Sequence, residues 1–236
     1  QRIGRDRLAA LMRHQTLTLG GSSRRFSTNP VAIGVPTADP DVPFILDFAT
    51  SVVAEGKCLV AHQGGKAIPT DALVDPDGVI TDNTFVLYGE TPEGTSPNPR
   101  HGTGALRAFG EHKGSGLALA CELLAGALTG SGTNGTPGDE MHTGMLSIYI
   151  DPARFDTEDS FMADVQGFLD WIKASAPIDA EAGVLTPGDI ERGNEAERRA
   201  NGIPITADTW NSLQQAARAA GLSQAAIDEI AGPQSG

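Results

Sequence analysis

The sequence predicts an α/β protein, because it combines sufficient length with one strand-length apolar run and one long apolar helix pattern. With 236 residues, 39% apolar content and 29 glycines, the chain can bury a core and has the turn residues that connect strands and helices. Residues 42–49 form a nearly continuous apolar run, which is typical of a strand buried on both faces. Residues 113–129 carry apolar side chains at helical spacing nearly all round, which predicts a buried helix.

The other elements are expected from the same kinds of pattern. Two further strands are predicted where β-favouring apolar residues end at a proline, at 31–36 and at 145–150. Amphipathic or alanine-rich patterns predict three later helices, at 160–173, 206–220 and 223–231. Thr206 and Ser223 are the expected N-caps of the last two. Residues 1–14 are compatible with a short helix.

Composition excludes several classes of function. The formal net charge of −13, with 17 basic residues against 30 acidic ones, argues against a nucleic-acid partner, which needs a basic surface. Cys58 and Cys121 lie in apolar surroundings far apart, which predicts buried thiols in a reducing compartment rather than a disulfide or a zinc site. No run reaches the roughly 20 apolar residues of a membrane span, and no signal peptide is recognisable, so the cytoplasm is expected.

Residues 130–135 match the GxGxxG pattern, but in the wrong context. In a dinucleotide-binding Rossmann fold this pattern lies between a strand and a helix, where the helix N-terminus meets the pyrophosphate. Here it follows the predicted helix and precedes a predicted strand. A surface loop is therefore the preferred interpretation.

Lys113 is the first candidate for an anion-binding residue. It stands beside Gly114 at the start of the long apolar helix, where a cation would combine with free backbone N–H groups and the positive end of the helix dipole. A solvated turn before a core helix is the alternative.

Asp47 is the second candidate, because it ends an otherwise apolar strand. An ionised carboxylate there would be costly to bury without partners, and ligand sites in α/β sheets favour the carboxyl ends of strands. Alternatively, Asp47 caps the next segment. No metal-ligand cluster, Ser-His-Asp order or pair of carboxylates is recognisable, and none of the five histidines is a persuasive general base.

Several phrases of the sequence occur together in an order that resembles the malate/L-lactate dehydrogenase-like family. Together they extend over about residues 24–206, which is more specific than any one of them. They are FSTNPVAIGVP at 26–36, LDFATSVVAEGK at 46–57, HKGSGLAL at 112–119 with ELLAGALTG at 122–130, residues 144–155, and PGDIE at 187–191 with Arg198 and NGIP at 201–204.

The resemblance implies a fold and a set of binding residues. It implies a non-Rossmann nicotinamide-binding α/β domain with a mixed sheet at 24–155, C-terminal helices of a second helical domain at 156–236, and an unplaced segment at 1–23. The substrate side would be formed by Thr28 and Asn29. The cofactor that it implies is NAD, with NADP as the alternative. The residues that it implies for binding this cofactor are Asp47, Phe48, Ala49, His112, Lys113, Gly114, Pro187, Gly188, Asp189 and Glu191.

The implied activity is hydride transfer between NAD(P) and a small 2-hydroxy or 2-oxo acid such as malate or lactate, in a homodimer without a metal. Alternatives are a cyclic-imine (ketimine) reductase of the same family and a truncated, non-catalytic cofactor-binding remnant. The Asp-Ser-His-Gly segment whose histidine exchanges the proton in relatives is not found, and the chain begins with Gln1 rather than Met. An upstream segment is therefore expected to be missing and the chain alone to be impaired. Glu55, where relatives often have Arg, favours NAD.

Overall fold

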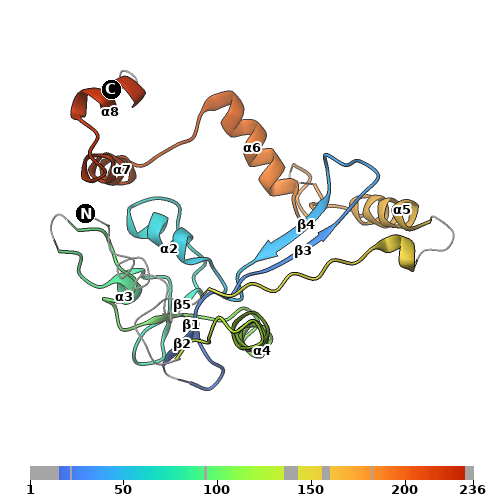
Figure 1. Ribbon diagram of the computed structural model, residues 1–236, viewed down its shortest axis with the longest axis horizontal. Coiled ribbons are helices and arrows are strands. Elements are labelled where there is room, and N and C mark those ends of the chain that lie inside the picture. Colours follow the sequence, from blue (N-terminus) through green and yellow to red (C-terminus); the bar gives the residue numbers. More distant parts are fainter. Residues whose placement is uncertain are drawn as a thin grey trace. The chain divides into compact units, whose positions relative to one another are not determined.

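The computed structural model describes residues 16–21, 23–92, 95–135, 143–155, 160–181 and 183–231 (Figure 1). The helix expected at 1–14 lies outside these residues. The chain divides into two compact units, the first formed by residues 1–51 and 108–202 and the second by residues 52–107 and 203–236, as far as they are described. Both contain helices and strands, so the predicted α/β class is confirmed. The expected domain boundary near residue 155 lies within the first unit and stays a prediction.

The first unit contains two antiparallel strand pairs. Strand β1 (Thr16–Leu17) pairs with β2 (Arg24–Phe26), and β3 (Val31–Val35) pairs with β4 (Phe44–Phe48) over five residue pairs. The strands predicted at 31–36 and 42–49 are therefore confirmed to within two residues. Thr37 closes the connection between β3 and β4, since its hydroxyl donates to the carbonyl oxygens of Asp39 at 2.8 Å and Val42 at 2.9 Å.

The β3–β4 ribbon is not buried on both faces, contrary to the sequence prediction. Side chains alternate along β4, so that Ile45 and Asp47 are exposed while Phe44, Leu46 and Phe48 are partly buried. Successive side chains of a strand point to opposite faces, and in this two-stranded ribbon only one face packs on other described residues.

The long apolar helix has the predicted extent to within two residues, but it is more exposed than its pattern predicts. Helix α4 covers His112–Cys121 and continues as a π-helix, η1, over Glu122–Ala127. Only small side chains or none are buried in it, at Gly114, Ser115, Ala118 and Gly126. Four leucines along it, at positions 119, 123, 124 and 128, are between 48% and 68% exposed. The prediction of a fully buried helix is therefore wrong for this chain: close backbone contacts, rather than large side chains, form its packed face.

Residues 145–150 do not form the predicted strand. They run as an extended segment without a paired strand among the described residues, and Tyr149 is 93% exposed. A β-strand needs a partner backbone to accept its N–H groups, and the apolar pattern alone does not supply one. This segment leads into a 3-10 turn, η2, at Pro152–Arg154, where Asp151 accepts a hydrogen bond from the Ala153 N–H.

Two helices complete the first unit. Helix α5 (Phe161–Lys173) confirms the helix predicted at 160–173. Helix α6 (Asp189–Asn201) was not predicted as a separate helix, because its sequence is strongly charged and its apolar positions are few and mostly small. Gly188 precedes it with φ = +98°, a left-handed conformation that glycine adopts without steric cost.

The second unit has a core around short strands and helices. Strands β6 (Ile80–Thr81) and β7 (Ala105–Leu106) both pair antiparallel with β5 (Leu73–Val74). Helices α2 (Glu55–His62) and α3 (Phe85–Tyr88) contribute to the core cluster. Its buried members are Val53, Cys58, Ile68, Ala72, Leu73, Leu87, Tyr88 and Leu106.

The last two helices confirm their prediction. Helix α7 covers Ala207–Ala219, and its cap Thr206 accepts a hydrogen bond from the Thr209 N–H at 3.2 Å. Helix α8 covers Gln224–Ala231, and the Ser223 hydroxyl accepts one from the Ala226 N–H at 3.2 Å. Among the described helices, none has both the length and the apolar character needed to cross a membrane.

Candidate functional site

Thr50 joins the segments that carry the first group of predicted site residues. Its backbone N–H and its hydroxyl both donate to the carbonyl oxygen of Thr28, at 2.8 and 2.9 Å, and its own carbonyl accepts from the Phe109 N–H at 3.1 Å. Because Thr50 is fully buried, these bonds are protected from water. They hold the Thr28-Asn29 segment, the end of β4 and the turn before α4 together.

Gly114 allows α4 to begin directly against this junction. A Cβ atom at this position would lie 2.6 Å from both the Thr50 and the Phe109 carbonyl oxygens, which is closer than van der Waals contact permits. The N–H of Gly114 donates to the Phe109 carbonyl at 2.8 Å. The predicted residue Gly114 therefore sets the close approach of the helix N-terminus, a role that requires the absence of a side chain.

The N-terminus of α4 differs from the sequence prediction in one respect. The N–H groups of Lys113, Gly114 and Ser115 are not free, since they donate to the carbonyls of Gly110, Phe109 and Glu111 at 2.8–3.1 Å. The reason is the left-handed turn at Gly110 and Glu111, both with φ = +50°, which directs the preceding carbonyls toward the helix. The positive groups left for an anion are the exposed Lys113 side chain and the helix dipole.

Asp47, Phe48 and Ala49 form the strand end next to this junction. Asp47 is opposite Ala32 in the ribbon and lies on its exposed face, so its carboxylate is solvated and does not need the burial partners that the sequence suggested. Phe48 packs edge to face on Phe109, with ring centroids 5.7 Å apart. Asp47 is thus accessible to a ligand, while Phe48 connects the strand to the turn before α4.

Asn29 takes part in a polar network that the sequence reasoning missed. Its Nδ2 donates to the Ala118 carbonyl and to Glu122 Oε1, both at 3.0 Å. Glu122 also accepts from the backbone N–H of Asn134 at 2.9 Å and from Asn134 Nδ2 at 2.6 Å. Asn29 itself has φ = +33°, a conformation that asparagine tolerates better than most residues. The sequence signal was the single acidic residue within the apolar stretch 117–128, to which no role was assigned.

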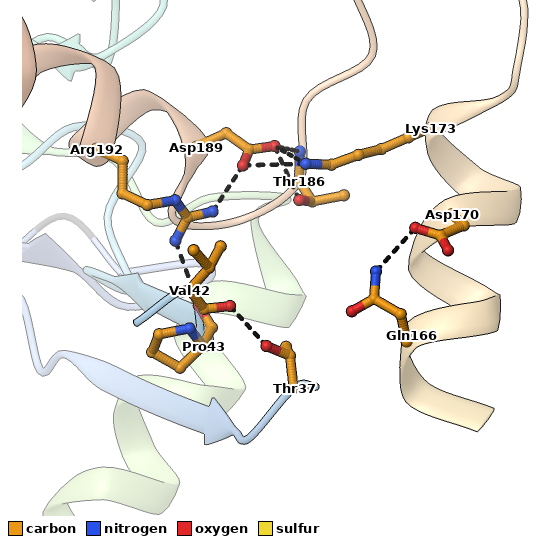
Figure 2. Close-up of polar contacts among 9 residues, drawn as sticks. All are labelled: Thr37, Val42, Pro43, Gln166, Asp170, Lys173, Thr186, Asp189 and Arg192. Carbon is orange, nitrogen blue, oxygen red and sulfur yellow. Dashed lines mark hydrogen bonds and ion pairs between the residues drawn. The ribbon is translucent and has the colours of Figure 1, made fainter. Parts of the chain in front are cut away.

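The second group of predicted site residues lies near the other end of the ribbon, where α6 begins (Figure 2). A cavity of about 220 Å³ is bounded there by Pro43 and Phe44 of the ribbon, by α5, and by Pro187 and Arg192. Gly188 is buried and Glu191 is exposed. The structure therefore brings Pro187, Gly188, Asp189 and Glu191 together, but away from the Thr50 junction at the opposite end of β4.

Asp189 is the centre of a cluster formed with Lys173, Thr186 and Arg192 (Figure 2). Its carboxylate accepts from the N–H and hydroxyl of Thr186 at 2.8 and 2.9 Å, from Arg192 Nη2 at 2.6 Å, and it pairs with Lys173 Nζ at 3.1 Å. Burial alone would raise the pKa of Asp189, but these hydrogen bonds outweigh it and hold that pKa well below its ordinary value. The Asp189 cluster therefore ties α5 to the start of α6.

Glu55, the residue expected to select NAD, is held by a neighbour in the second unit. The buried Tyr88 hydroxyl donates to Glu55 Oε1. Burial, reinforced by this hydrogen bond, raises the pKa of Tyr88 above its ordinary value. Burial also raises the pKa of the Cys58 thiol to about 12, which confirms Cys58 as a buried thiol, whereas Cys121, predicted to be buried as well, is only partly buried. Glu55 is thus partly buried and hydrogen-bonded to Tyr88, so it is not a freely solvated helix residue.

The described histidines form no catalytic pair. His62 packs on Tyr88 with ring centroids 4.6 Å apart and contacts the Thr84 hydroxyl at 3.1 Å, while His101 and His112 are exposed. His14 and His142 lie outside the described residues. Over the described part of the chain, no group of His, Cys, Asp or Glu side chains is arranged to hold a metal ion.

Comparison with known proteins establishes the family. The model of the family described as malate/L-lactate dehydrogenase matches residues 10–214, which is most of the chain. The chain belongs to the malate/L-lactate dehydrogenase family. The predicted resemblance is therefore confirmed.

Members of this family with different names are similar to the chain. Hydroxycarboxylate dehydrogenase B of Escherichia coli O157:H7 is 38% identical over 209 residues, which cover 86% of this chain and 54% of the relative. Delta(1)-pyrroline-2-carboxylate reductase of Ancylobacter novellus is 35% identical over 205 residues, covering 83% and 54%. The chain thus spans about half the length of the curated relatives that it matches.

A solved structure in the family shares the fold. Malate dehydrogenase from Pyrococcus horikoshii OT3 superposes with a TM-score of 0.66 at 25% identity, over 90% of this chain and 56% of that one. The mixed α/β fold of the family therefore extends over most of the present chain.

Proposed function

We propose that this malate/L-lactate dehydrogenase family member takes part in hydride transfer between a nicotinamide cofactor and C2 of a small 2-hydroxy or 2-oxo acid. The observation that carries the proposal is the Thr50 junction, which holds Thr28, Asn29 and the start of α4 with Lys113 in one place. Family membership supports the same reaction class. The protein's contribution is to orient the reactants and to place charge next to them.

The residues present fit a dinucleotide. Lys113 offers an exposed cation beside the positive end of α4, which suits a phosphate, and Asp47 is accessible at the adjoining strand end. The cavity beside Pro187 lies about 13 Å along the ribbon from this junction, from Phe44 to Phe48, so an extended ligand is needed to contact both ends. The cofactor, when bound, supplies the hydride acceptor or donor.

In this proposal each group of residues has a defined part. The cofactor phosphates are held by Lys113 and His112. The strand end beside them is formed by Asp47, Phe48 and Ala49. The far end of the dinucleotide is bordered by Pro187, Gly188, Asp189 and Glu191. Thr28 and Asn29 are adjacent to the substrate. The non-Rossmann form of cofactor binding is part of the proposal, as are the homodimer and the cytoplasmic location. Proton exchange is assigned to a histidine outside residues 1–236, by the resemblance described above.

The proposal is tested by assaying reduced cofactor oxidation with the 2-oxo acids of malate and lactate. Residues 1–236 alone are expected to turn over slowly, since general acid–base catalysis typically contributes about 10²- to 10⁴-fold. The whole protein, including any sequence that precedes residue 1, is expected to be faster by that factor. Equal rates would contradict the assignment of the proton-transfer group.

Cyclic-imine reduction is the second candidate. A relative 35% identical to the chain carries the name Delta(1)-pyrroline-2-carboxylate reductase, and its substrate name shares a carboxylate next to the reducible carbon with 2-oxo acids. Supplying the cyclic imine in the same assay distinguishes the two, because a reductase of this type would reduce the imine at the higher kcat/KM.

Cofactor preference is expected to favour NAD over NADP and to depend on Glu55. A carboxylate repels a 2′-phosphate and can accept hydrogen bonds from ribose hydroxyls. In the whole protein, Glu55→Arg is therefore expected to narrow or reverse the ratio of kcat/KM for NADH over NADPH. Because Glu55 also accepts from Tyr88, thermal unfolding is measured alongside, and Glu55→Gln is the control that removes the charge but keeps an acceptor. If the ratio of kcat/KM for NADH over NADPH is unchanged in a folded Glu55→Arg protein, Glu55 does not select the cofactor and only accepts the hydrogen bond from Tyr88.

A further inference from the structure

Glu122 connects three segments that are distant in the sequence. Its Oε1 accepts from the side-chain Nδ2 of both Asn29 and Asn134, and its Oε2 accepts from the Asn134 backbone N–H. The three bonds link the β2–β3 connection, the π-helix η1 and the loop after it. A carboxylate with three donors in one place forms charge-assisted hydrogen bonds, which are stronger than neutral ones.

The position of Glu122 in the helix is unusual as well. It is the first residue of η1, and i→i+5 bonds such as Leu128 N–H to Leu123 O at 2.9 Å mark the wider turn. The π-helix is rare, and π-helical turns are found frequently at functional sites. A second cavity, of about 220 Å³, is lined by Glu122 and Asn134 together with Phe26 and Leu119.

The network determines which way the Asn29 amide faces. Both hydrogens of Nδ2 are used, one by the Ala118 carbonyl and one by Glu122. If the amide were flipped, its Oδ1 would face two acceptors and both bonds would be lost. Oδ1 makes no hydrogen bond to the described residues, so it remains available as an acceptor.

We infer that Glu122 is a positioning residue, which fixes the Asn29 amide so that Oδ1 accepts a hydrogen bond from an N–H or O–H group of the bound reactants. This inference rests on the proposed function, because that function places Asn29 beside the substrate and cofactor. Two donors have this chemistry, the hydroxyl of a 2-hydroxy acid and the carboxamide of the nicotinamide. Glu122 contacts neither of them; it acts through Asn29.

The test is a double-mutant cycle in the whole protein, with Glu122→Gln, Asn29→Ala and the two combined. Glutamine has the same shape but only one acceptor oxygen. If that oxygen takes the place of Oε1, the glutamine NH2 faces the Asn134 N–H, and if it takes the place of Oε2, the NH2 faces both asparagine side chains. In either orientation the network loses at least one bond and the Asn29 amide is held less firmly. We expect kcat/KM to fall about tenfold or more in each single variant, since misplaced polar contacts are costly at the reacting centre. The combined variant should be no slower than Asn29→Ala alone. Glu195→Gln, which removes an exposed i,i+4 ion pair with Arg199, is the matched control.

Two further measurements identify which group donates to Asn29 Oδ1 and distinguish a failure of this inference from a failure of the proposed function. A raised dissociation constant for reduced cofactor would assign the donor to the carboxamide, whereas an unchanged constant with lowered kcat/KM would assign it to the hydroxyl. Independently of activity, the Asn29 Nδ2 protons should exchange slowly with solvent in the wild type and faster in Glu122→Gln. Unprotected protons, or additive losses in an active protein, would overturn this inference alone. A wild-type protein without turnover would overturn the proposed function and this inference with it.

Discussion

Replacing Lys113 by alanine is expected to weaken the binding of reduced cofactor by about ten- to hundredfold. A charge-assisted hydrogen bond to a phosphate contributes on the order of 1.5–3 kcal/mol, and each 1.4 kcal/mol corresponds to about a factor of ten. The side chain has to supply this contact, because the N–H groups of Lys113, Gly114 and Ser115 already donate to the preceding turn. Fluorescence titration with NADH and NADPH measures the change.

The control for Lys113→Ala is Lys66→Ala, which removes an exposed lysine outside the proposed site. Lys66→Ala lowers the positive charge by one, as Lys113→Ala does. It should leave the dissociation constant for reduced cofactor unchanged. Increasing ionic strength should weaken wild-type binding more than binding to Lys113→Ala, since salt screens exposed charges. Unchanged affinity in a folded Lys113→Ala protein would identify the lysine as part of a solvated turn.

Replacing Asp189 by asparagine is expected to lower the free energy of unfolding by about 1–3 kcal/mol at neutral pH. The substitution keeps the shape but removes a charge that accepts from Thr186, Arg192 and Lys173, and the donors of this partly buried cluster lose their partner. The Asp189 side chain is 16% exposed, so water replaces these bonds only in part. Chemical denaturation of the wild type and the variant measures the difference.

The contribution of Asp189 also has a defined pH dependence. Its pKa in the folded protein is lowered, so the charged form stabilises the fold above the unfolded-state value of about 4, and this stabilisation is lost as the pH falls from about 5 toward the lowered pKa. The gap between wild type and Asp189→Asn should therefore shrink in acid. Asp170→Asn, on the same cavity but exposed and bonded to Gln166, is the control. A gap that is constant with pH would contradict the cluster's electrostatic role. A loss of cofactor affinity without a loss of stability would show that Asp189 acts in binding alone and does not stabilise the fold.

Local patterns predicted the elements whose formation depends on nearby residues. The strands at 31–36 and 42–49 and the helices beginning near 161, 207 and 224 follow from apolar spacing, proline and cap residues, all of which act over a few positions. Helix α6 was missed because its sequence is strongly charged and its few apolar positions are mostly small. It is set instead by a left-handed Gly188 and by the Asp189 cluster, whose members come from α5, the preceding loop and α6.

The predictions that failed depended on contacts distant in the sequence. An apolar run such as 145–150 shows that a segment favours burial, but it does not name the strand that would pair with it. In the candidate site, too, some residues are recognisable from their neighbours in the sequence and others only from contacts made on folding. Lys113 and Gly114 are recognisable as residues at a helix start, whereas Glu122 becomes a site residue only because folding brings it to Asn29, 93 positions away. The first N–H groups of α4 are likewise already hydrogen-bonded because of the left-handed turn at Gly110 and Glu111, which no residue pattern predicted.

The most direct test of the account is isotope transfer by the whole protein. Reduced cofactor carrying deuterium on the transferring face of C4 is incubated with the 2-oxo acid of malate or lactate, and the product is examined by mass spectrometry. Hydride transfer predicts one deuterium at C2 of the 2-hydroxy acid, formed in proportion to the cofactor oxidised. Oxidation of the cofactor without deuterium in the product, or no cofactor-dependent product with either the 2-oxo acids or a cyclic imine, would contradict it.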